Sequence, residues 1–187
     1  SCGKPALGVG PGNAPCYIET SANVKRACTD LMMSKTFDNG MICASEQAVI
    51  VDKVISNLFE SYMKENGCYF LNDEEIKKVS AYVINSEKGA VNPDVVGKSP
   101  FWIAQQSGVQ VPERTKILIA RLKDVGPEYP LSREKLSPVL AYYVVNNHVE
   151  GFEMCRKMLD MGGLGHTAII HSTNSDLIEK FGKAMKL

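Results

Sequence analysis

The chain has 187 residues, of which 44% are hydrophobic and 22% are charged, and its 21 basic residues balance 21 acidic ones. This composition is that of an ordinary globular domain and excludes a disordered chain. The lack of a basic excess argues against a nucleic-acid partner, and no apolar run approaches the roughly 18 residues of a membrane-spanning helix. We therefore expect a soluble, cytoplasmic domain that binds neither nucleic acid nor membrane.

Predicted elements in the first half of the chain alternate between short β-rich runs and amphipathic helices. Apolar side chains recur at helical spacing from Val24 to Met32, and again from Val54 to Tyr62. In chain order we predict a strand at residues 16–19, a helix at 21–35 capped by Ser21, a strand at 48–51, a helix at 54–66 ended by Gly67, a helix at 73–85 and a short helix after Pro100.

The second half continues the alternation. We predict strands at residues 115–122 and 139–145, a helix at 148–160, a turn at Gly162 and Gly163, a strand at 167–170 and a helix from Ser175. Strands alternating with helices of this length predict an α/β fold with a mostly parallel sheet and helices on both faces. We expect one domain over residues 1–187. Because the chain opens on Ser1 and stops within a helical pattern, we expect it to be a piece of a longer polypeptide.

The six cysteines stand at positions 2, 16, 28, 43, 68 and 155. They form no Cys-x-x-Cys pair and have no paired histidines nearby, so we expect no metal site. The size and aliphatic content of the chain favour free thiols in a reducing compartment over disulfides. Most such thiols are small buried core residues.

Cys43 is the thiol with a distinct setting. It lies in a loop that follows a predicted helix and precedes a buried strand, where a side chain can point into a crevice at the edge of a sheet. A buried thiol is the commoner state at such a position. A nucleophile would need a lowered thiolate pKa or a neighbouring base, and no base is adjacent in the sequence.

Three other segments carry residues suited to chemistry. The run from Gly8 to Asn13 is glycine-rich, but it has no preceding strand and Pro11 removes an amide donor, so a tight turn near a crevice fits better than a phosphate loop. Glu134 is flanked by basic residues, as solvated surface carboxylates commonly are. His166 follows three glycines just before a predicted strand and is either a proton carrier or a structural histidine.

Taken in order, these segments resemble the CoA-acylating aldehyde dehydrogenases, and most of all the aldehyde dehydrogenase half of bifunctional aldehyde–alcohol dehydrogenases. The matching segments are residues 8–15 (GVGPGNAP), 34–40 (SKTFDNG), 42–47 (ICASEQ), 115–119 (TKILI), 134–138 (EKLSP) and 162–167 (GGLGHT). The resemblance covers essentially the whole chain but matches the catalytic domain of the family alone. It implies a three-layer catalytic domain without the NAD-binding domain.

The resemblance also implies an activity: reversible conversion of acetaldehyde, coenzyme A and NAD⁺ into acetyl-CoA and NADH, as in fermentation. Cys43 would be the nucleophile that forms a thiohemiacetal and then a thioester. Glu134 would bind the nicotinamide ribose, and the Gly10 carbonyl would meet the carboxamide. His166 would relay a proton during thiol exchange. The implied partners are a small aldehyde, an acyl-CoA and further copies of the parent protein, as a homo-oligomer or filament.

One departure from the wider superfamily fits an acyl transfer to coenzyme A. Hydrolytic relatives carry a glutamate that activates water in the segment matching residues 8–13, and no carboxylate stands there in this chain. Two alternatives remain open. One is a cysteine-dependent acyltransferase or hydrolase that uses Cys43 with His166 and no nicotinamide. The other is a non-catalytic assembly module.

Overall fold

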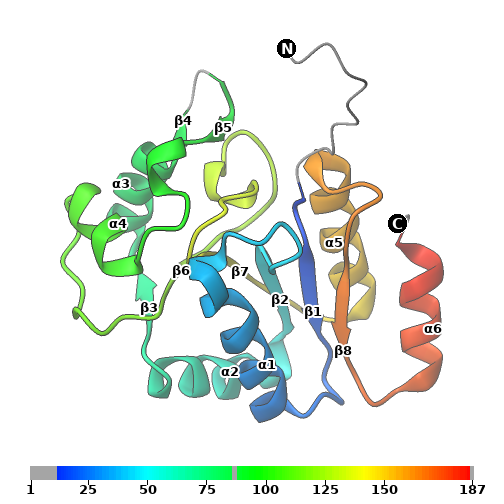
Figure 1. Cartoon of the computed structure of the whole chain (residues 1–187). Coiled ribbons are helices and arrows are strands. Elements are labelled where there is room, and N and C mark those ends of the chain that lie inside the picture. The colour runs from blue at the N-terminus through cyan, green and yellow to red at the C-terminus, as the bar shows by residue number, and fades with distance from the viewer. Residues whose placement is uncertain (1–11, 86–87, 186–187) are drawn as a thin grey trace.

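The computed structural model describes residues 12–85 and 88–185 (Figure 1). Its main sheet has six parallel strands in the order β3-β6-β7-β2-β1-β8, and β4 and β5 form a separate antiparallel hairpin. The strands are β1 (Pro15–Ile18), β2 (Ala48–Asp52), β3 (Cys68–Leu71), β4 (Ile84–Asn85), β5 (Ala90–Val91), β6 (Ile117–Arg121), β7 (Val139–Val145) and β8 (Ile169–His171). The predicted α/β class with a mostly parallel sheet is confirmed.

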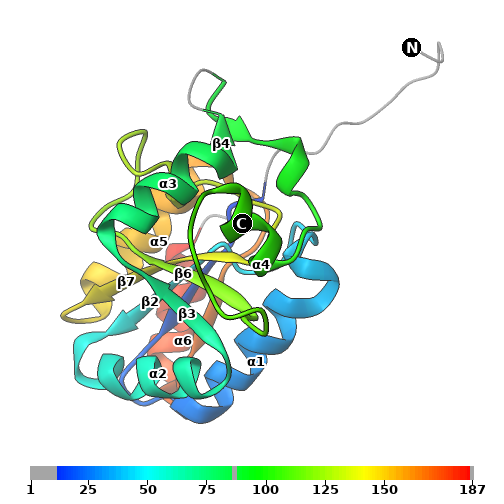
Figure 2. The same cartoon turned by 90° about the vertical axis from the view of Figure 1, so that its left-hand side faces the viewer.

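Helices cover both faces of the sheet and complete three layers. The α-helices are α1 (Val24–Thr36), α2 (Lys53–Glu65), α3 (Asp73–Val83), α4 (Pro100–Gln106), α5 (His148–Gly162) and α6 (Ser175–Ala184); short 3-10 turns are η1 (Phe37–Gly40), η2 (Pro93–Val95) and η3 (Pro130–Ser132). Helices α1 and α2 pack on one face, and α3 to α6 pack on the other. Figure 2 shows the strands between α3 and α5 on one side and α1 on the other. No helix of the described ranges is long and apolar enough to cross a membrane.

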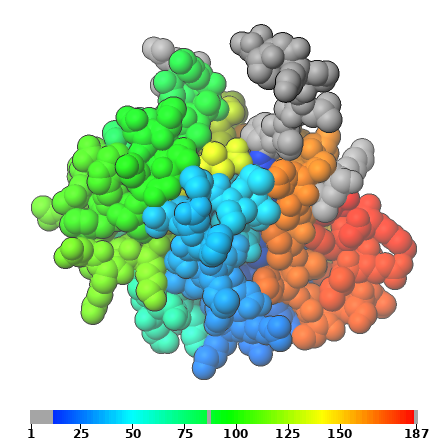
Figure 3. Space-filling model, viewed as in Figure 1, coloured from blue at the N-terminus to red at the C-terminus, as the bar shows by residue number. Residues whose placement is uncertain are grey.

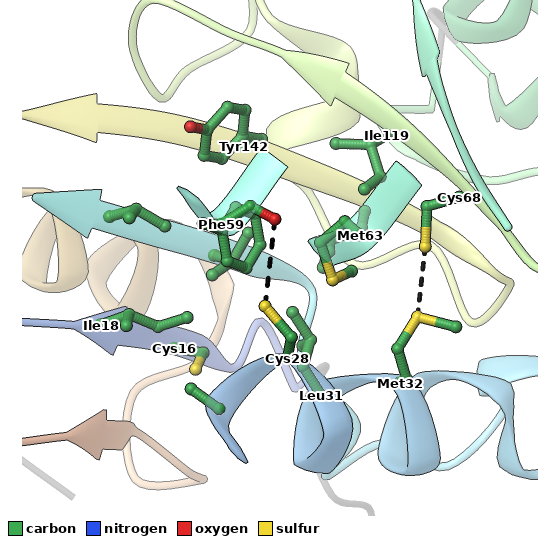
Figure 4. Close-up of a cluster of buried hydrophobic side chains, with 14 of the residues drawn as sticks. Cys16, Ile18, Cys28, Leu31, Met32, Phe59, Met63, Cys68, Ile119 and Tyr142 are labelled. Atoms are coloured by element: carbon green, nitrogen blue, oxygen red, sulfur yellow. Dashed lines mark hydrogen bonds between the residues drawn. The ribbon is translucent and has the colours of Figure 1, made fainter. Parts of the chain in front are cut away.

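The layer under α1 and α2 holds three of the cysteines (Figure 4). Cys28 donates a weak hydrogen bond from its Sγ to the carbonyl oxygen of Phe59 at 3.9 Å, and the Sγ of Cys68 lies 3.1 Å from the Sδ of Met32. Cys16 is fully buried beside them, and Cys155 is buried on the opposite face. These four thiols are the small core residues that the sequence led us to expect.

Element boundaries differ from the predicted ones where polar groups have other partners. Ser21 does not cap α1, because its hydroxyl donates to Glu19 and accepts from the amide of Thr173; the cap is Asn23, which accepts from the amide of Arg26. Helix α3 stops at Val83, where the chain turns into the β4–β5 hairpin. Helix α5 runs on through Gly162 instead of ending at residue 160. Strand β3 was not predicted, although its four residues, CYFL, form an apolar run between Gly67 and the capping box that starts α3.

Parallel pairing places the start of every strand at one edge of the main sheet. Strands β7, β2, β1 and β8 are consecutive in the sheet, so the segments that precede them must lie side by side. These segments carry Glu134, Cys43, Gly12 and His166, respectively. In Figure 1 they meet at the upper edge, beside the β4–β5 hairpin. The candidate site is therefore built at the amino ends of four adjacent strands, whereas open α/β sheets commonly bind ligands at the carboxyl ends.

Candidate active site

Gly12 lies at the centre of this edge and brings three predicted site residues together. Its amide donates a hydrogen bond to Glu134 Oε1 at 2.9 Å. A Cβ atom on Gly12 would lie 2.7 Å from the carbonyl oxygen of Cys43 and 2.9 Å from Nε2 of His166. The loops of Cys43 and His166 thus pack against Gly12 from one side, and Glu134 accepts a hydrogen bond from the Gly12 amide. A glycine is required because any side chain would push these loops apart.

Cys43 is exposed, unlike the four buried thiols of the described residues. The interpretation of Cys43 as a buried core thiol is therefore wrong, because its loop turns outward at the sheet edge instead of entering the core. Burial raises the pKa of Cys28, Cys68 and Cys155 to about 12, and it also raises the pKa of Cys16 well above its ordinary value. Of the thiols in residues 12–85 and 88–185, Cys43 is consequently the one that a small carbonyl compound can reach. No group of acidic, cysteine or histidine side chains in the described ranges could hold a metal ion.

Strained backbone flanks the site. The non-glycine residues with left-handed backbone in residues 12–85 and 88–185 are Asp38, Asn39 and Leu136, at φ 48°, 50° and 43°. The first two precede Cys43 and the third follows Glu134. A shared bond network holds them: the Asn39 side chain donates to the carbonyl of Gly97 at 2.9 Å, and the Gly97 amide donates to the carbonyl of Leu136 at 3.4 Å. Such strain persists where surrounding contacts fix it, and it clusters at functional sites.

The ring of His166 has one nitrogen engaged and one turned toward the site. Its Nδ1 lies 2.9 Å from Thr167 Oγ1, and the tautomer of the ring decides which atom donates. When Nδ1 carries the proton, it donates a hydrogen bond to Thr167 Oγ1, and Nε2 is left as a proton acceptor on the side of Gly12 and Cys43. This arrangement suits a proton carrier.

Glu134 is half-buried, so the interpretation of this carboxylate as a solvated surface charge is wrong. It is drawn inward by the Gly12 amide and lines a cavity of about 170 Å³ together with Asn13, Arg133 and residues 89–91 of the hairpin. Asn13 is structural: its Nδ2 donates to the carbonyls of Ser132 and Met158 at 2.9 and 3.3 Å, which ties the start of β1 to η3 and α5. In Figure 3 the segment at residues 130–138 reaches the surface beside the Cys43 loop.

An apolar groove of about 290 Å³ lies on the other side of the Cys43 loop. It is lined by Met33, Ser34, Phe37, Ile42, Ala44 and Ser45. The side chains of Met33 and Phe37 are 69% and 62% exposed, which is unusual for residues of this size and polarity. Since Ile42 and Ala44 adjoin Cys43 in the chain, the groove places an exposed apolar surface beside the Cys43 loop.

Sequence reasoning missed two residues of the site, and Gly10 lies outside the described residues. Gly12 was taken only as part of a turn. Lys35 was not singled out either, although the sequence held a signal. Lys35 falls on the apolar face of α1, where an ordinary amphipathic helix has no lysine. Lys35 is fully buried, and burial lowers its pKa to about 7. Lys135 is also fully buried, and burial holds its pKa well below the ordinary value.

Known proteins are similar to this chain in both sequence and fold, although no family model matches the chain. The aldehyde-alcohol dehydrogenase of Streptococcus pneumoniae serotype 4 is 49% identical over 193 residues, which cover 100% of this chain and 22% of that protein. The crystal structure of an acetylating aldehyde dehydrogenase from Geobacillus thermoglucosidasius superimposes with a TM-score of 0.93 at 46% identity, over 98% of this chain and 40% of that one. This chain belongs to the CoA-acylating aldehyde dehydrogenase family.

The resemblance read from the sequence motifs is thereby confirmed at the level of the family. A solved structure of lower identity adds chemistry: the propionaldehyde dehydrogenase of Rhodopseudomonas palustris was solved with bound CoA and an acylated cysteine. It is 28% identical, with a TM-score of 0.83 over 97% of this chain and 40% of that one. This chain spans 22% of the curated relative and 40% of each solved structure.

Proposed function

We propose that this chain is the nucleophile-bearing catalytic domain of a longer, cytoplasmic, NAD-dependent acetaldehyde dehydrogenase that transfers the acetyl group to coenzyme A. The observation that carries the proposal is the convergence of an exposed Cys43 with His166 and Glu134 around Gly12. The acylated cysteine of the Rhodopseudomonas palustris enzyme supports the same chemistry.

Cys43 performs the covalent steps. Its thiolate attacks the aldehyde carbonyl, and the carbonyl π electrons move to oxygen to give a thiohemiacetal. Loss of hydride from the former carbonyl carbon re-forms the carbonyl group as a thioester of Cys43. The thiolate of coenzyme A then attacks that thioester and expels the Cys43 thiolate. One thioester replaces another, so little free energy is lost and the reaction runs in both directions.

His166 acts at the thiol-exchange step. Coenzyme A must lose its thiol proton before it attacks, and in the tautomer described above Nε2 of His166 is free to accept that proton. Water competes poorly for the acyl group, because residues 8–13 contain no carboxylate that could serve as its general base. The acyl group therefore stays on Cys43 until a thiol attacks the thioester.

The described residues fit one end of a nicotinamide nucleotide. The Glu134 carboxylate is an acceptor for ribose hydroxyls and is held in place by the Gly12 amide. When bound, NAD⁺ supplies the hydride acceptor. The cavity beside Glu134 measures about 170 Å³, well below the roughly 300–1,000 Å³ of ordinary ligand sites. This chain alone should therefore fold but not turn over, because most of the dinucleotide site must come from elsewhere.

The test is a hydride-transfer assay on the longer enzyme and on this chain. We expect NADH formation from acetaldehyde in the longer enzyme to depend on coenzyme A, to vanish in Cys43→Ser, and to be absent from the 187-residue chain. Glu134→Gln should raise KM for NAD⁺ by about 10-fold, the cost of one hydrogen bond to a charged group. Thioester hydrolysis with no hydride transfer would instead establish the cysteine hydrolase. Full activity of the isolated chain would also overturn the proposal.

A further inference from the structure

A buried polar cluster lies beneath the loop that carries Cys43. The end of α1 supplies Lys35, the loop supplies Ser45 and Glu46, and the segment after η3 supplies Lys135 and Ser137; all five side chains are buried. These three segments are in close contact, because a Cβ on Gly40 would lie 2.8 Å from the carbonyl oxygen of Ser137 and 3.1 Å from that of Lys35. The cluster thus adjoins both Cys43 and Glu134 in the chain.

Lys35 is the member of this cluster whose charge has no direct partner. Its Nζ makes no hydrogen bond with the described residues and no ion pair within 4.0 Å. The other buried amine is fully engaged: Lys135 Nζ donates to the carbonyls of Leu131 and Arg133 at 2.8 and 2.6 Å, and its backbone amide donates to Gln47 at 2.9 Å. A buried amine without a bond is costly and calls for a charge that compensates it.

Two carboxylates act on the charge of Lys35. Glu46 is 6% exposed and accepts a 2.5 Å hydrogen bond from the Ser34 hydroxyl. Glu134 is the carboxylate that holds Gly12. Burial lowers the pKa of Lys35, whereas Glu46 and Glu134 both raise it; the charge of Lys35 in turn lowers the pKa of Lys135. The protein interior between these groups has a lower dielectric constant than water, so their charges interact over longer distances.

We propose that Lys35 is a positioning residue whose buried cation serves as the shared counter-charge of Glu46 and Glu134. Without that cation, the negative charges of Glu46 and Glu134 would not be offset. The resulting repulsion would turn Glu134 away from the Gly12 amide, which removes the ribose acceptor. The consequence for nucleotide binding rests on the proposed function; the coupling of Lys35 to the two carboxylates does not.

The coupling is tested on this chain by NMR with lysines labelled with ¹³C at Cε. We expect one lysine signal, absent from Lys35→Met, to titrate near neutral pH. Its midpoint should fall in Glu46→Gln and in Glu134→Gln, and it should not move in Glu128→Gln, an exposed control. A Lys35 signal that titrates like the surface lysines, or that ignores both substitutions, would overturn the proposal whether or not the chain takes part in aldehyde oxidation.

The positioning role is tested kinetically in the longer enzyme. At about pH 6.5, where Lys35 is mostly charged, Lys35→Met should raise KM for NAD⁺ by about 10-fold and leave the rate of acyl transfer from acetyl-CoA to Cys43 unchanged. Glu46→Gln added to Lys35→Met should recover part of the loss, because one of the two repelling carboxylates is gone. Lys25→Met, on the exposed side of the same helix, is the control. Equal losses in both steps, or no recovery in the double variant, would show that Lys35 merely supports the fold.

Discussion

The amide of Gly12 donates to the carboxylate of Glu134 across 122 positions of sequence, at 2.9 Å. This bond joins the starts of β1 and β7, which are separated in the sheet by β2. Cys43 precedes β2 and lies against Gly12 through its carbonyl oxygen. The Cys43 loop therefore lies between the two segments that this hydrogen bond joins, and Gly12 is the residue on which the geometry of the candidate site depends.

Substitution of Gly12 should disable the site while leaving the fold intact. In Gly12→Ala the new Cβ would displace the carbonyl of Cys43 or the ring of His166, and displacements of about 1 Å in active sites cost on the order of 100-fold in rate. The measurement is steady-state aldehyde oxidation by the longer enzyme, with urea unfolding in parallel. Gly182→Ala is the control, because no atom lies within 4 Å of a Cβ there. Wild-type activity in Gly12→Ala would show that the loops are not held as described.

Alkylation should single out Cys43 among the described cysteines. A thiol with a pKa of about 12, as in Cys28, Cys68 and Cys155, has on the order of one thiolate in 10⁴ at pH 8. Limiting iodoacetamide under native conditions, in a Cys2→Ser background, followed by peptide mapping, should find the label on Cys43. Preferential labelling of Cys28 or Cys155 would contradict the assignment.

The sequence predicted the fold well because its signals are local and regular. The helical spacing of α1 and the apolar run of β6 each specify an element whose packing follows from its own residues. The site was less predictable, because it depends on which strands become neighbours. Nothing in the sequence near Glu134 indicates that its partner is Gly12. Lys35, on the apolar face of α1, was a local signal of a buried charge. Its role could not be predicted, because the carboxylates that act on it lie in other segments, which the fold brings to it.

Loss of His166 should slow thiol exchange and spare hydride transfer. General acid–base groups contribute roughly 10²–10⁴-fold, so His166→Gln should keep a rapid first turnover of NADH and lose at least about 100-fold in the steady state. Stopped-flow measurement of the burst separates the two phases. His148→Gln, at the start of α5 away from the site, is the matched control. A variant that loses the burst and the steady state in equal proportion would assign His166 to an earlier step.

Stability should rise with pH just above neutrality, in part because of Lys35. Burial lowers its pKa to about 7, against about 10.4 in an unfolded chain. Above pH 7 the unfolded chain therefore binds a proton that the folded chain lacks, and the free energy of unfolding rises by up to about 1.4 kcal/mol per pH unit. The buried thiols act with the opposite sign as the pH approaches about 8.5, so urea unfolding is compared between pH 7 and 8. Lys35→Met should reduce this slope and leave the part that comes from Lys135, whose pKa burial also holds well below its ordinary value. An unchanged slope would exclude Lys35 as a source.

Mass spectrometry of the acyl enzyme can locate the acyl group that we assign to Cys43. The longer enzyme is incubated with acetyl-CoA in the absence of nucleotide, quenched in acid and digested. We expect one acetyl group on Cys43, removed by hydroxylamine as a thioester should be, retained longer in His166→Gln when free coenzyme A is added, and absent from Cys43→Ser. An acetyl group on another cysteine, or its persistence in Cys43→Ser, would contradict the account.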